Sequence, residues 1–379
     1  MISCPTLFTL KWRTKMFKSL SSSSGTRHPG FFPTVIEHYP PILDGKFDYN
    51  SAFAAFLAAT EQKKQTASMV GLLADKLQKR NVLLKNSESI KVADLGCADG
   101  TTCLGYLHNM AHPAGFEYIG FDINDRFIQE ANAAISNCAL IKKYELIKED
   151  VLAGILSAHP SVHPHSMDLI FISHLAYYLK DEAYCKLFLT DILSLLNNSG
   201  IAIFLHEDST YYFRKTYNTS YTNSSAPSLL KNTAADVLKI AGQFNEISFS
   251  SKLHFAEMSD ELWQAASTPV RYKEYVDNQD FIDNLNKMSF IVQCDLSRLA
   301  HEGSLSSFLH DLRGILEANN NSFNLETSMQ VLVSPENIYA KEIDAALREM
   351  ERDTLIAHAA TASPCSSSDQ AGVTSVPVL

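Results

Sequence analysis

The chain of 379 residues is long enough for one large domain or two smaller ones. Its 46% hydrophobic and 20% charged residues are typical of a globular protein, and its net charge of −10 argues against nucleic-acid binding by the chain as a whole. No apolar run approaches the length of a membrane span, so we expect no membrane association.

Cysteine and histidine usage indicates the compartment and argues against a metal site. The seven cysteines are scattered and odd in number, which indicates free thiols in a reducing, cytoplasmic setting. There is no Cys-x-x-Cys pair, and the three histidines between residues 159 and 165 lie in a proline-containing loop. We therefore predict no metal site.

Both ends of the chain have the composition of tails. Residues 1–36 contain no Asp or Glu and carry five Lys or Arg with a run of serines. They resemble an organelle-targeting segment, with Met16 as an alternative start, and a disordered basic tail is the competing interpretation. Residues 357–379 are rich in Ala, Ser and Thr, which predicts a second disordered tail. The folded domain is predicted at residues 37–356.

A helical pattern begins at Asp48. Apolar residues recur at helical spacing around Phe53 and Phe56, and again from Met69 to Leu77. Glu61 stands between the two runs. Most glutamates in such positions are solvated helix charges, so this pattern alone assigns Glu61 no role.

The most informative stretch is residues 90–100. Residues 91–95 form a short apolar run that predicts a buried parallel strand. The run breaks at Gly96, a second glycine follows at Gly100, and a helical pattern begins near Thr101. A strand, a glycine turn and a helix open a nucleotide-binding α/β unit, because the backbone must turn sharply and approach a ligand closely.

The details of this turn select among ligands. A dinucleotide site needs Gly-x-Gly-x-x-Gly, whereas this turn has Ala98 at its centre and the acid Asp99, which would repel a pyrophosphate. Asp94-Leu-Gly-Cys-Ala-Asp-Gly100 resembles motif I of the class I S-adenosylmethionine-dependent methyltransferases, in which this loop holds the methionine end of the cofactor. The alternatives are a turn without a ligand and a different nucleotide. The resemblance assigns the following residues to the cofactor: Asp94, Gly96, Ala98, Asp99 and Gly100.

A second strand, residues 117–122, ends in Asp122. A carboxylate at this point can accept hydrogen bonds from both ribose hydroxyls of a nucleoside. We therefore assign Asp122 to the cofactor site, together with the adjacent Ile123. Asp125 is interpreted as the cap of a helix at residues 126–134.

A third strand is predicted at residues 144–147. In class I methyltransferases an acid just after this strand contacts the adenine amino group, which makes Asp150 the candidate and Glu149 the second choice. The alternative is that Asp150 caps a helix at residues 151–156.

The fourth strand, residues 167–172, leads into candidate substrate residues. Ligands of open α/β sheets bind beyond the carboxyl ends of the strands. Ser173 is assigned to the cofactor, and His174, Tyr177 and Tyr178 to the substrate, with His174 as the catalytic candidate because imidazole can accept a proton near neutral pH. A hydrogen-bonded structural role for His174 and helix packing for one tyrosine are the alternatives.

Strands that alternate with helices predict an α/β fold, a doubly wound Rossmann-like sheet. The sheet is mostly parallel and seven-stranded, with an added helical lid region. The cofactor half is expected at about residues 85–210, and substrate and lid elements at about 45–80 and 211–335. The elements after the fourth strand are predicted as a helix at 186–196, a strand at 201–205, a loop at 209–228, a helix at 236–241, a strand at 247–255, helices within 259–318 and a strand at 325–333.

Residues 49–333 are similar to the histamine N-methyltransferase family in layout and in local runs. Residues 167–181 match that family's fourth-strand segment without gaps. The resemblance implies substrate binding by Glu61, by His174 where the family has glutamine, and by Glu326 near the position of an asparagine. These two replacements change the charge of the implied substrate site. The resemblance therefore supports methylation of an amine more strongly than it supports histamine as the substrate.

The expected reaction is direct in-line transfer of a methyl group from S-adenosyl-L-methionine to a small-molecule amine. Two acids near the pocket favour an amine over a carboxylate, because a buried acid pair would repel an anion. A methyltransferase acting on oxygen, carboxyl or protein side chains, and a non-catalytic interaction module, stay open. We expect a monomer without nucleic-acid or membrane partners.

Overall fold

The computed structural model describes most of the chain after residue 48. The described residues are 49–82, 89–110, 112–153, 159–175, 178–179, 181–207, 209–218, 244–268, 274–275, 277–334 and 336–362. The predicted basic tail at 1–36, the helix at 236–241 and Tyr177 lie outside these ranges. Within them, no helix is long and apolar enough to cross a membrane.

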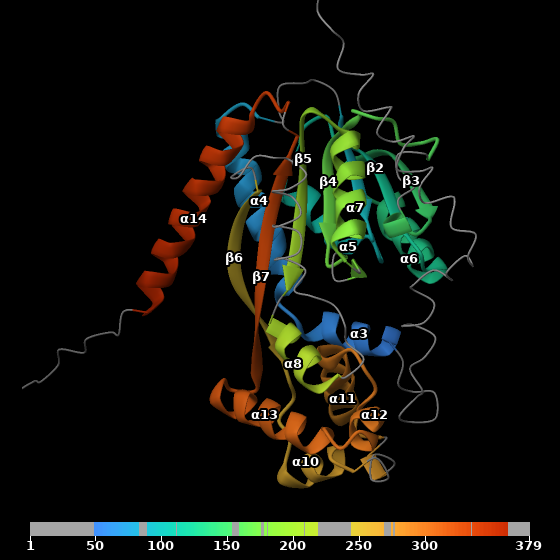
Figure 1. The fold of residues 1–379 in the computed structure, drawn as a ribbon, viewed down its shortest axis with the longest axis vertical. Coiled ribbons are helices and arrows are strands. Elements are labelled where there is room, and N and C mark those ends of the chain that lie inside the picture. The colour runs from blue at the N-terminus through green and yellow to red at the C-terminus, as the bar shows by residue number, and fades with distance from the viewer. Residues whose placement is uncertain are drawn as a thin grey trace, which may run out of the picture. The chain divides into compact units, whose positions relative to one another are not determined.

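The described part of the chain forms a seven-stranded sheet with the strand order β3-β2-β1-β4-β5-β7-β6 (Figure 1). Strands β1 to β5 pair in parallel, whereas β7 is antiparallel to both of its neighbours. This confirms the predicted α/β fold with a mostly parallel sheet. The strands are β1 Ile90–Leu95, β2 Phe116–Asp122, β3 Ile141–Lys148, β4 Met167–Ser173, β5 Leu196–Glu207, β6 Phe244–His254 and β7 Ser322–Val333.

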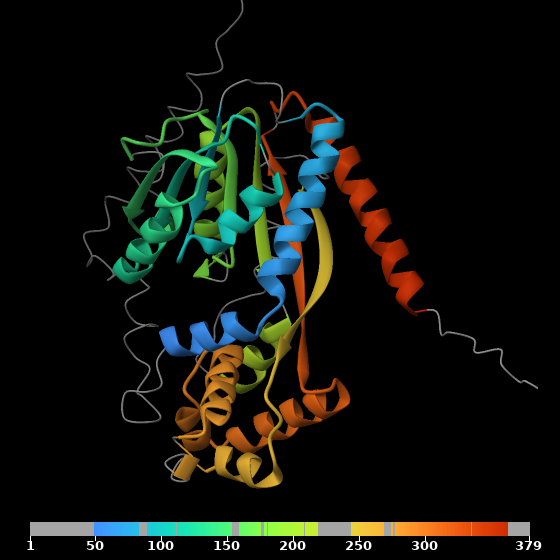
Figure 2. The same ribbon diagram turned by 180° about the vertical axis from the view of Figure 1, so that it is seen from behind.

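Helices cover both faces of the sheet. Figure 1 shows α7 on one face, and Figure 2 shows α4, α5 and α14 on the other. The helices are α3 Tyr49–Ala59, α4 Gln62–Lys79, α5 Thr101–Met110, α6 Asp125–Ser136, α7 Glu182–Leu195, α8 Ser209–Tyr217, α10 Asp260–Ala266, α11 Gln279–Val292, α12 Leu296–His301, α13 Leu305–Ala318 and α14 Ala340–Ala362, with a 3₁₀ turn at Val151–Ala153.

Each face of the sheet has its own hydrophobic core, because side chains alternate between the faces along each strand. Val92 and Phe171 pack with residues of α4, α5 and α14 in one cluster. Ile172 and Phe204 pack with Phe188 and its neighbours on α7 in the other. Full burial of one such side chain stabilises the fold by about 1.5–3 kcal/mol, so the central strands need nearly continuous apolar sequence.

The C-terminal helix α14 extends further than the composition predicts. It runs through Ala362, so the first residues of the predicted tail at 357–379 are helical. Lys76 of α4 anchors this helix, with its Nζ 3.0 Å from Glu349 Oε1 and 2.6 Å from Asp353 Oδ2. The alanines at the start of the predicted tail are common in disordered segments but also have a high helix propensity. Composition alone therefore does not determine where α14 ends.

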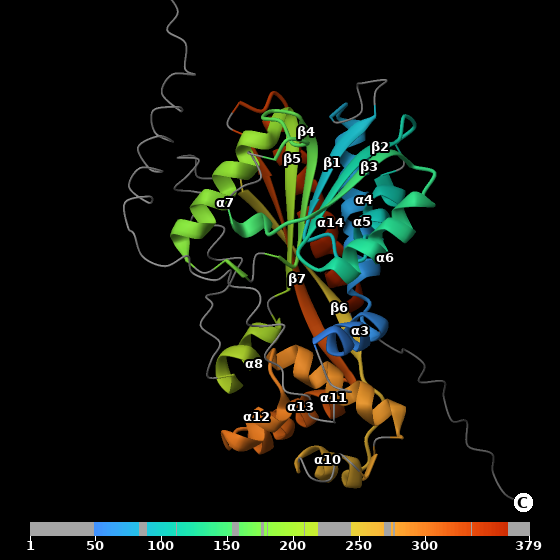
Figure 3. The same ribbon diagram turned by 90° about the vertical axis from the view of Figure 1, so that its right-hand side faces the viewer.

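A group of helices gathers at the end of the sheet where β5 ends (Figure 3). It contains α8 and α10 to α13, with α11 packed against both α3 and α8. The predicted loop at 209–228 is wrong for its first part, which is α8. Glu207 accepts hydrogen bonds from Thr210 N at 2.9 Å and Thr210 Oγ1 at 2.6 Å. These hydrogen bonds give an acceptor to the first turn of α8. The polar and aromatic residues of α8 do not by themselves predict a helix.

Candidate active site

The loop between β1 and α5 has an unusual backbone. Gly96, Ala98 and Gly100 have φ of 77°, 46° and 74°, in the left-handed region that only glycine adopts readily. The N–H groups of Gly96 and Cys97 donate to the carbonyl of Phe121 at 2.9 and 2.8 Å, which fastens the loop to β2. Left-handed alanine costs about 1–2 kcal/mol, and such strain is concentrated at functional sites.

Asp122 links this loop to the end of β2. Its Oδ2 accepts a hydrogen bond from Ala98 N at 3.0 Å, and its Oδ1 accepts one from Asn124 N at 2.8 Å. Burial raises the pKa of Asp122, and these backbone donors oppose the rise. A carboxylate can accept about four hydrogen bonds, so Asp122 retains capacity for hydroxyl groups of a ligand. The residues at this loop therefore fit a nucleoside cofactor, with Ile123 directly beside Asp122.

Asp99 forms a side-chain turn directly before α5. Its Oδ1 accepts hydrogen bonds from Thr101 N at 3.1 Å and Thr101 Oγ1 at 2.7 Å. Lys63 of α4 approaches the same place, 3.7 Å from Asp99 Oδ2 and 2.9 Å from Thr101 Oγ1. This local turn explains the acid in the loop without a ligand, and a cofactor contact by Asp99 stays a prediction.

The other acids predicted around the cofactor also have local partners. Asp150 Oδ1 accepts a hydrogen bond from Leu152 N at 3.0 Å, so Asp150 caps the 3₁₀ turn. Contact with adenine stays a prediction. Asp125 was expected to cap the next helix, but Asn124 does so instead, because its side chain accepts from Arg126 N.

Asp94 lies beneath the loop and is buried. Burial raises the pKa of its carboxyl to about 7, while a hydrogen bond from Tyr118 Oη at 2.7 Å lowers it. A carboxyl this close to its titration point at neutral pH is common at functional sites and rare elsewhere.

The ends of β4 and β5 bring together two histidines. Ser173 Oγ lies 3.2 Å from the hydroxyl of Tyr106. His174 follows it with a left-handed φ of 56°, and its N–H donates to the carbonyl of Leu205 at 2.8 Å. Ser173 on β4 pairs with Leu205 on β5. The residues that follow them, His174 and His206, therefore lie at the same end of the sheet.

Both histidines are neutral at pH 7. Burial lowers the pKa of His174 to about 4, and the charges of Arg214 and Lys63 lower it further. Burial, with a contribution from His174, lowers the pKa of His206 to about 3. His174 can therefore accept a hydrogen bond from a substrate but is a weak base, and its catalytic role stays a prediction.

The predicted acidic substrate residues are exposed. Glu61 Oε1 lies 3.3 Å from His254 Nε2, with 45% of the glutamate side chain exposed. Glu326 is exposed on β7. The argument that a buried acid pair selects an amine is therefore wrong, because water solvates both carboxylates. Tyr178 is half-buried, and Tyr177 lies outside the described residues.

Three residues of this region were missed by the sequence analysis. Lys63 and Arg214 come from helices far apart in the chain, and only the fold brings them toward His174. His206 had a usable signal, since it directly follows the predicted fifth strand. Within the described ranges, no group of three or more His, Cys, Asp or Glu side chains could hold a metal ion.

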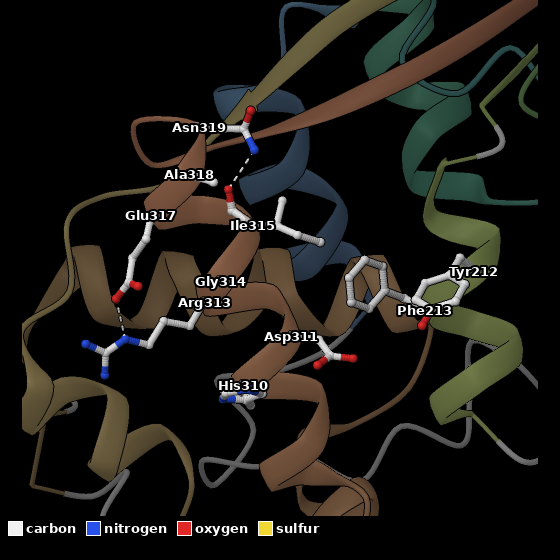
Figure 4. Close-up of a pocket in the computed structure, with 10 residues that line it drawn as sticks. All are labelled: Tyr212, Phe213, His310, Asp311, Arg313, Gly314, Ile315, Glu317, Ala318 and Asn319. Atoms are coloured by element: carbon white, nitrogen blue, oxygen red, sulfur yellow. Dashed lines mark hydrogen bonds and ion pairs between the residues drawn. The ribbon is translucent and has the colours of Figure 1, made fainter.

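A cavity of about 700 Å³ lies between α8 and α13. Figure 4 shows Tyr212 and Phe213 facing α13, and the ion pair of Arg313 with Glu317 at its other side. None of its lining residues is among the predicted site residues, so this cavity is separate from the loop and from His174. They are Tyr212, Phe213, His310, Asp311, Arg313, Gly314, Ile315, Glu317, Ala318 and Asn319.

Comparison with known proteins identifies the domain. Residues 86–260 match a family model described as a methyltransferase domain. No curated protein matches the chain. The family match spans β1 to β6, and therefore the glycine loop, Asp122 and His174.

Several solved structures are similar at low identity. The YcgJ protein from Bacillus subtilis is 12% identical, with 70% of this chain and 98% of that chain covered and a TM-score of 0.39. The plantazolicin methyltransferase BpumL in complex with SAH is 12% identical, with 75% and 90% covered and a TM-score of 0.37. A SAM-dependent methyltransferase from Methanosarcina mazei is 16% identical, with 47% and 89% covered and a TM-score of 0.33.

These TM-scores are too low to carry an argument about substrate. The domain match and the site geometry agree on the cofactor, because the matched residues include both the left-handed glycine loop and the acid that ends β2. Residues 86–260 therefore carry a methyltransferase domain, and the chain is an S-adenosylmethionine-dependent methyltransferase.

Proposed function

We propose that the chain transfers a methyl group directly to a nitrogen atom of a small amine. The observation that supports this is the environment of His174, where burial and the charges of Arg214 and Lys63 lower the pKa of a basic group to about 4. The same environment would lower the pKa of a bound amine for the same reasons, which increases the fraction of neutral amine. Only the neutral amine has a lone pair available for attack.

The residues of the chain mainly have to position the acceptor. When bound, S-adenosylmethionine supplies a methyl group on a sulfonium sulfur, which is an excellent leaving group. The glycine loop and Asp122 would hold it, and the ends of β4 and β5 would align the acceptor. Alignment of this kind can supply on the order of 7–11 kcal/mol of barrier reduction.

His174 would accept a hydrogen bond from the acceptor nitrogen. The lowered pKa of His174 favours a hydrogen-bonding role over a proton-accepting one. His174→Gln should therefore retain more activity than His174→Ala. His301→Gln, on α12, changes an exposed histidine in the same way and serves as the matched control.

A carboxylate acceptor is the second candidate. The charges of Lys63 and Arg214 would attract an anion, and the exposed Glu61 and Glu326 do little to repel one. Glu61→Gln tests whether the Glu61 carboxylate takes part in binding of the acceptor. A higher KM for an amine would support its participation, and an unchanged KM would leave it a solvated surface charge.

The test is a screen of acceptors with purified protein and S-adenosylmethionine. The panel contains histamine, other biogenic amines and small carboxylic acids, with release of S-adenosylhomocysteine as the readout and mass spectrometry to locate the methyl group. An N-methylated product supports the proposal, and a methyl ester supports the second candidate. Cofactor binding without transfer to any member would contradict both. The proposal requires a single copy of the chain and neither nucleic acid nor membrane.

A further inference from the structure

Tyr118 and Gly120 lie two residues apart on β2, so their positions face the same side of the sheet. In the register with β1, Tyr118 is opposite Val92, and Gly120 is opposite Asp94. Tyr118 must therefore reach diagonally past Gly120 to contact the Asp94 carboxylate. It does so, with its Oη donating to Asp94 Oδ2 at 2.7 Å.

Gly120 provides the room for this diagonal contact. A Cβ atom at Gly120 would lie 2.8 Å from Tyr118 Cε1, 3.0 Å from Tyr118 Oη and 2.8 Å from Leu146 Cδ2. Contacts under 3 Å are essentially never seen for real Cβ atoms. The phenol ring therefore lies directly over Gly120, and no other residue fits there while Tyr118 keeps its place.

The contact is buried on both sides. Tyr118 is 1% exposed and Asp94 is 3% exposed. Burial raises the pKa of Asp94 to about 7, and hydrogen bonds from Tyr118 and Cys103 act against this rise. Burial also raises the pKa of Tyr118, so the phenol keeps its proton and donates it in the hydrogen bond. The donated bond favours the charged form of Asp94.

We propose that Tyr118 and Gly120 form a positioning unit for the cofactor, in which the Tyr118 hydroxyl donates to Asp94 and favours its charged form directly before the glycine loop. A carboxylate there attracts the net positive charge of S-adenosylmethionine, whereas a protonated carboxyl does not. The unit acts through Asp94 and concerns binding of the cofactor alone, so it does not depend on the identity of the methyl acceptor.

Calorimetric titration with S-adenosylmethionine between pH 5.5 and 8.5 tests the proposal. For the wild type we expect affinity to fall as the pH decreases through neutrality, and for Asp94→Asn we expect weak binding without this dependence. Tyr118→Phe keeps the ring but removes the donor. It should weaken binding at pH 7 about tenfold, which equals 1.4 kcal/mol, and move the midpoint of the pH dependence upward.

Two further variants separate positioning from general destabilisation. Gly120→Ala displaces the ring and should move the midpoint in the same direction as Tyr118→Phe. Tyr217→Phe is the matched control, since it removes a hydrogen bond from a tyrosine to Asp311 on α13 and should leave the midpoint unchanged. A loss of structural stability alone would lower the melting temperature without moving the midpoint.

The proposal is overturned if folded Tyr118→Phe has the wild-type affinity and midpoint. If Tyr118→Phe does not fold, the calorimetric titration of the wild type still tests the proposal. An affinity that is constant from pH 5.5 to 8.5 would show that ionisation of Asp94 does not control cofactor binding.

Discussion

Replacement of Asp122 by alanine should remove most of the affinity for S-adenosylmethionine. Two of the roughly four acceptor sites of its carboxylate are used by the N–H groups of Ala98 and Asn124. The remaining sites can accept two ribose hydroxyls. A hydrogen bond to a charged group contributes about 1.5–3 kcal/mol, so two of them contribute about 3–6 kcal/mol, which corresponds to about 10²- to 10⁴-fold weaker binding.

The same substitution should cost less in stability than in affinity. Asp122 is half-buried at the end of its strand, so water can reach the two N–H groups that lose their acceptor, and we expect a loss of about 1–2 kcal/mol in the free energy of unfolding. Asp122→Asn keeps one carbonyl oxygen and should give intermediate affinity. Asp125→Ala, three residues after Asp122, removes an exposed acid that pairs with Lys148. It should change neither the cofactor affinity nor the free energy of unfolding.

Isothermal titration calorimetry with S-adenosylmethionine and S-adenosylhomocysteine measures the affinities, with NAD as the negative control. Circular dichroism establishes that each variant is folded. A folded Asp122→Ala variant that binds both compounds as tightly as the wild type would remove Asp122 from the cofactor site and refute the hydrogen-bond argument.

Three further predictions concern the loop, the C-terminal helix and pH. Gly96→Ala places a side chain at φ 77° and should lower stability by about 1–2 kcal/mol with weaker cofactor binding, measured by thermal denaturation and calorimetry. Lys76→Met should cost only about 1 kcal/mol but speed proteolysis of α14, because Glu349 and Asp353 are partly exposed and become solvated. The raised pKa of Asp94, about 7 against an ordinary 3.8, means that the folded state holds this proton more tightly. Stability should therefore fall as pH rises from about 4 to 7 and then level, and Asp94→Asn should lose this dependence in denaturant titrations.

The central strands β1, β4 and β5 were predictable because they are buried on both faces of the sheet. Such strands appear as short apolar runs, and each is followed by a turn or helix signal, as residues 167–172 show. The helices α8 and α14 were not predicted. The first is stabilised by Glu207 from the preceding strand, which leaves no local pattern in the sequence. The second has a local pattern that was missed, because Ile343, Ala346, Leu347 and Met350 recur at helical spacing and are buried.

The site was predictable only where one short segment contains it. The glycine loop and Asp122 carry their geometry in adjacent residues, and the structure shows the expected strand, turn and helix. The positive charge near His174 comes from Lys63 and Arg214, which are brought to this region by tertiary packing. Exposure of Glu61 is likewise a property of the folded surface, which residue type and spacing do not determine.

The pairing of β6 with β7 has a consequence for how the helices between these two strands are connected to the sheet. His254 at the end of β6 is opposite Ser322 at the start of β7, so the helices α10 to α13 leave and rejoin the sheet at neighbouring positions. A short hairpin turn could join the same two strands without altering any pair in the sheet. The strand pairing of the sheet therefore does not depend on the helical segment, whereas α3 and α8 do contact it through α11. A change in the length of this segment would leave the register of β6 and β7 unchanged.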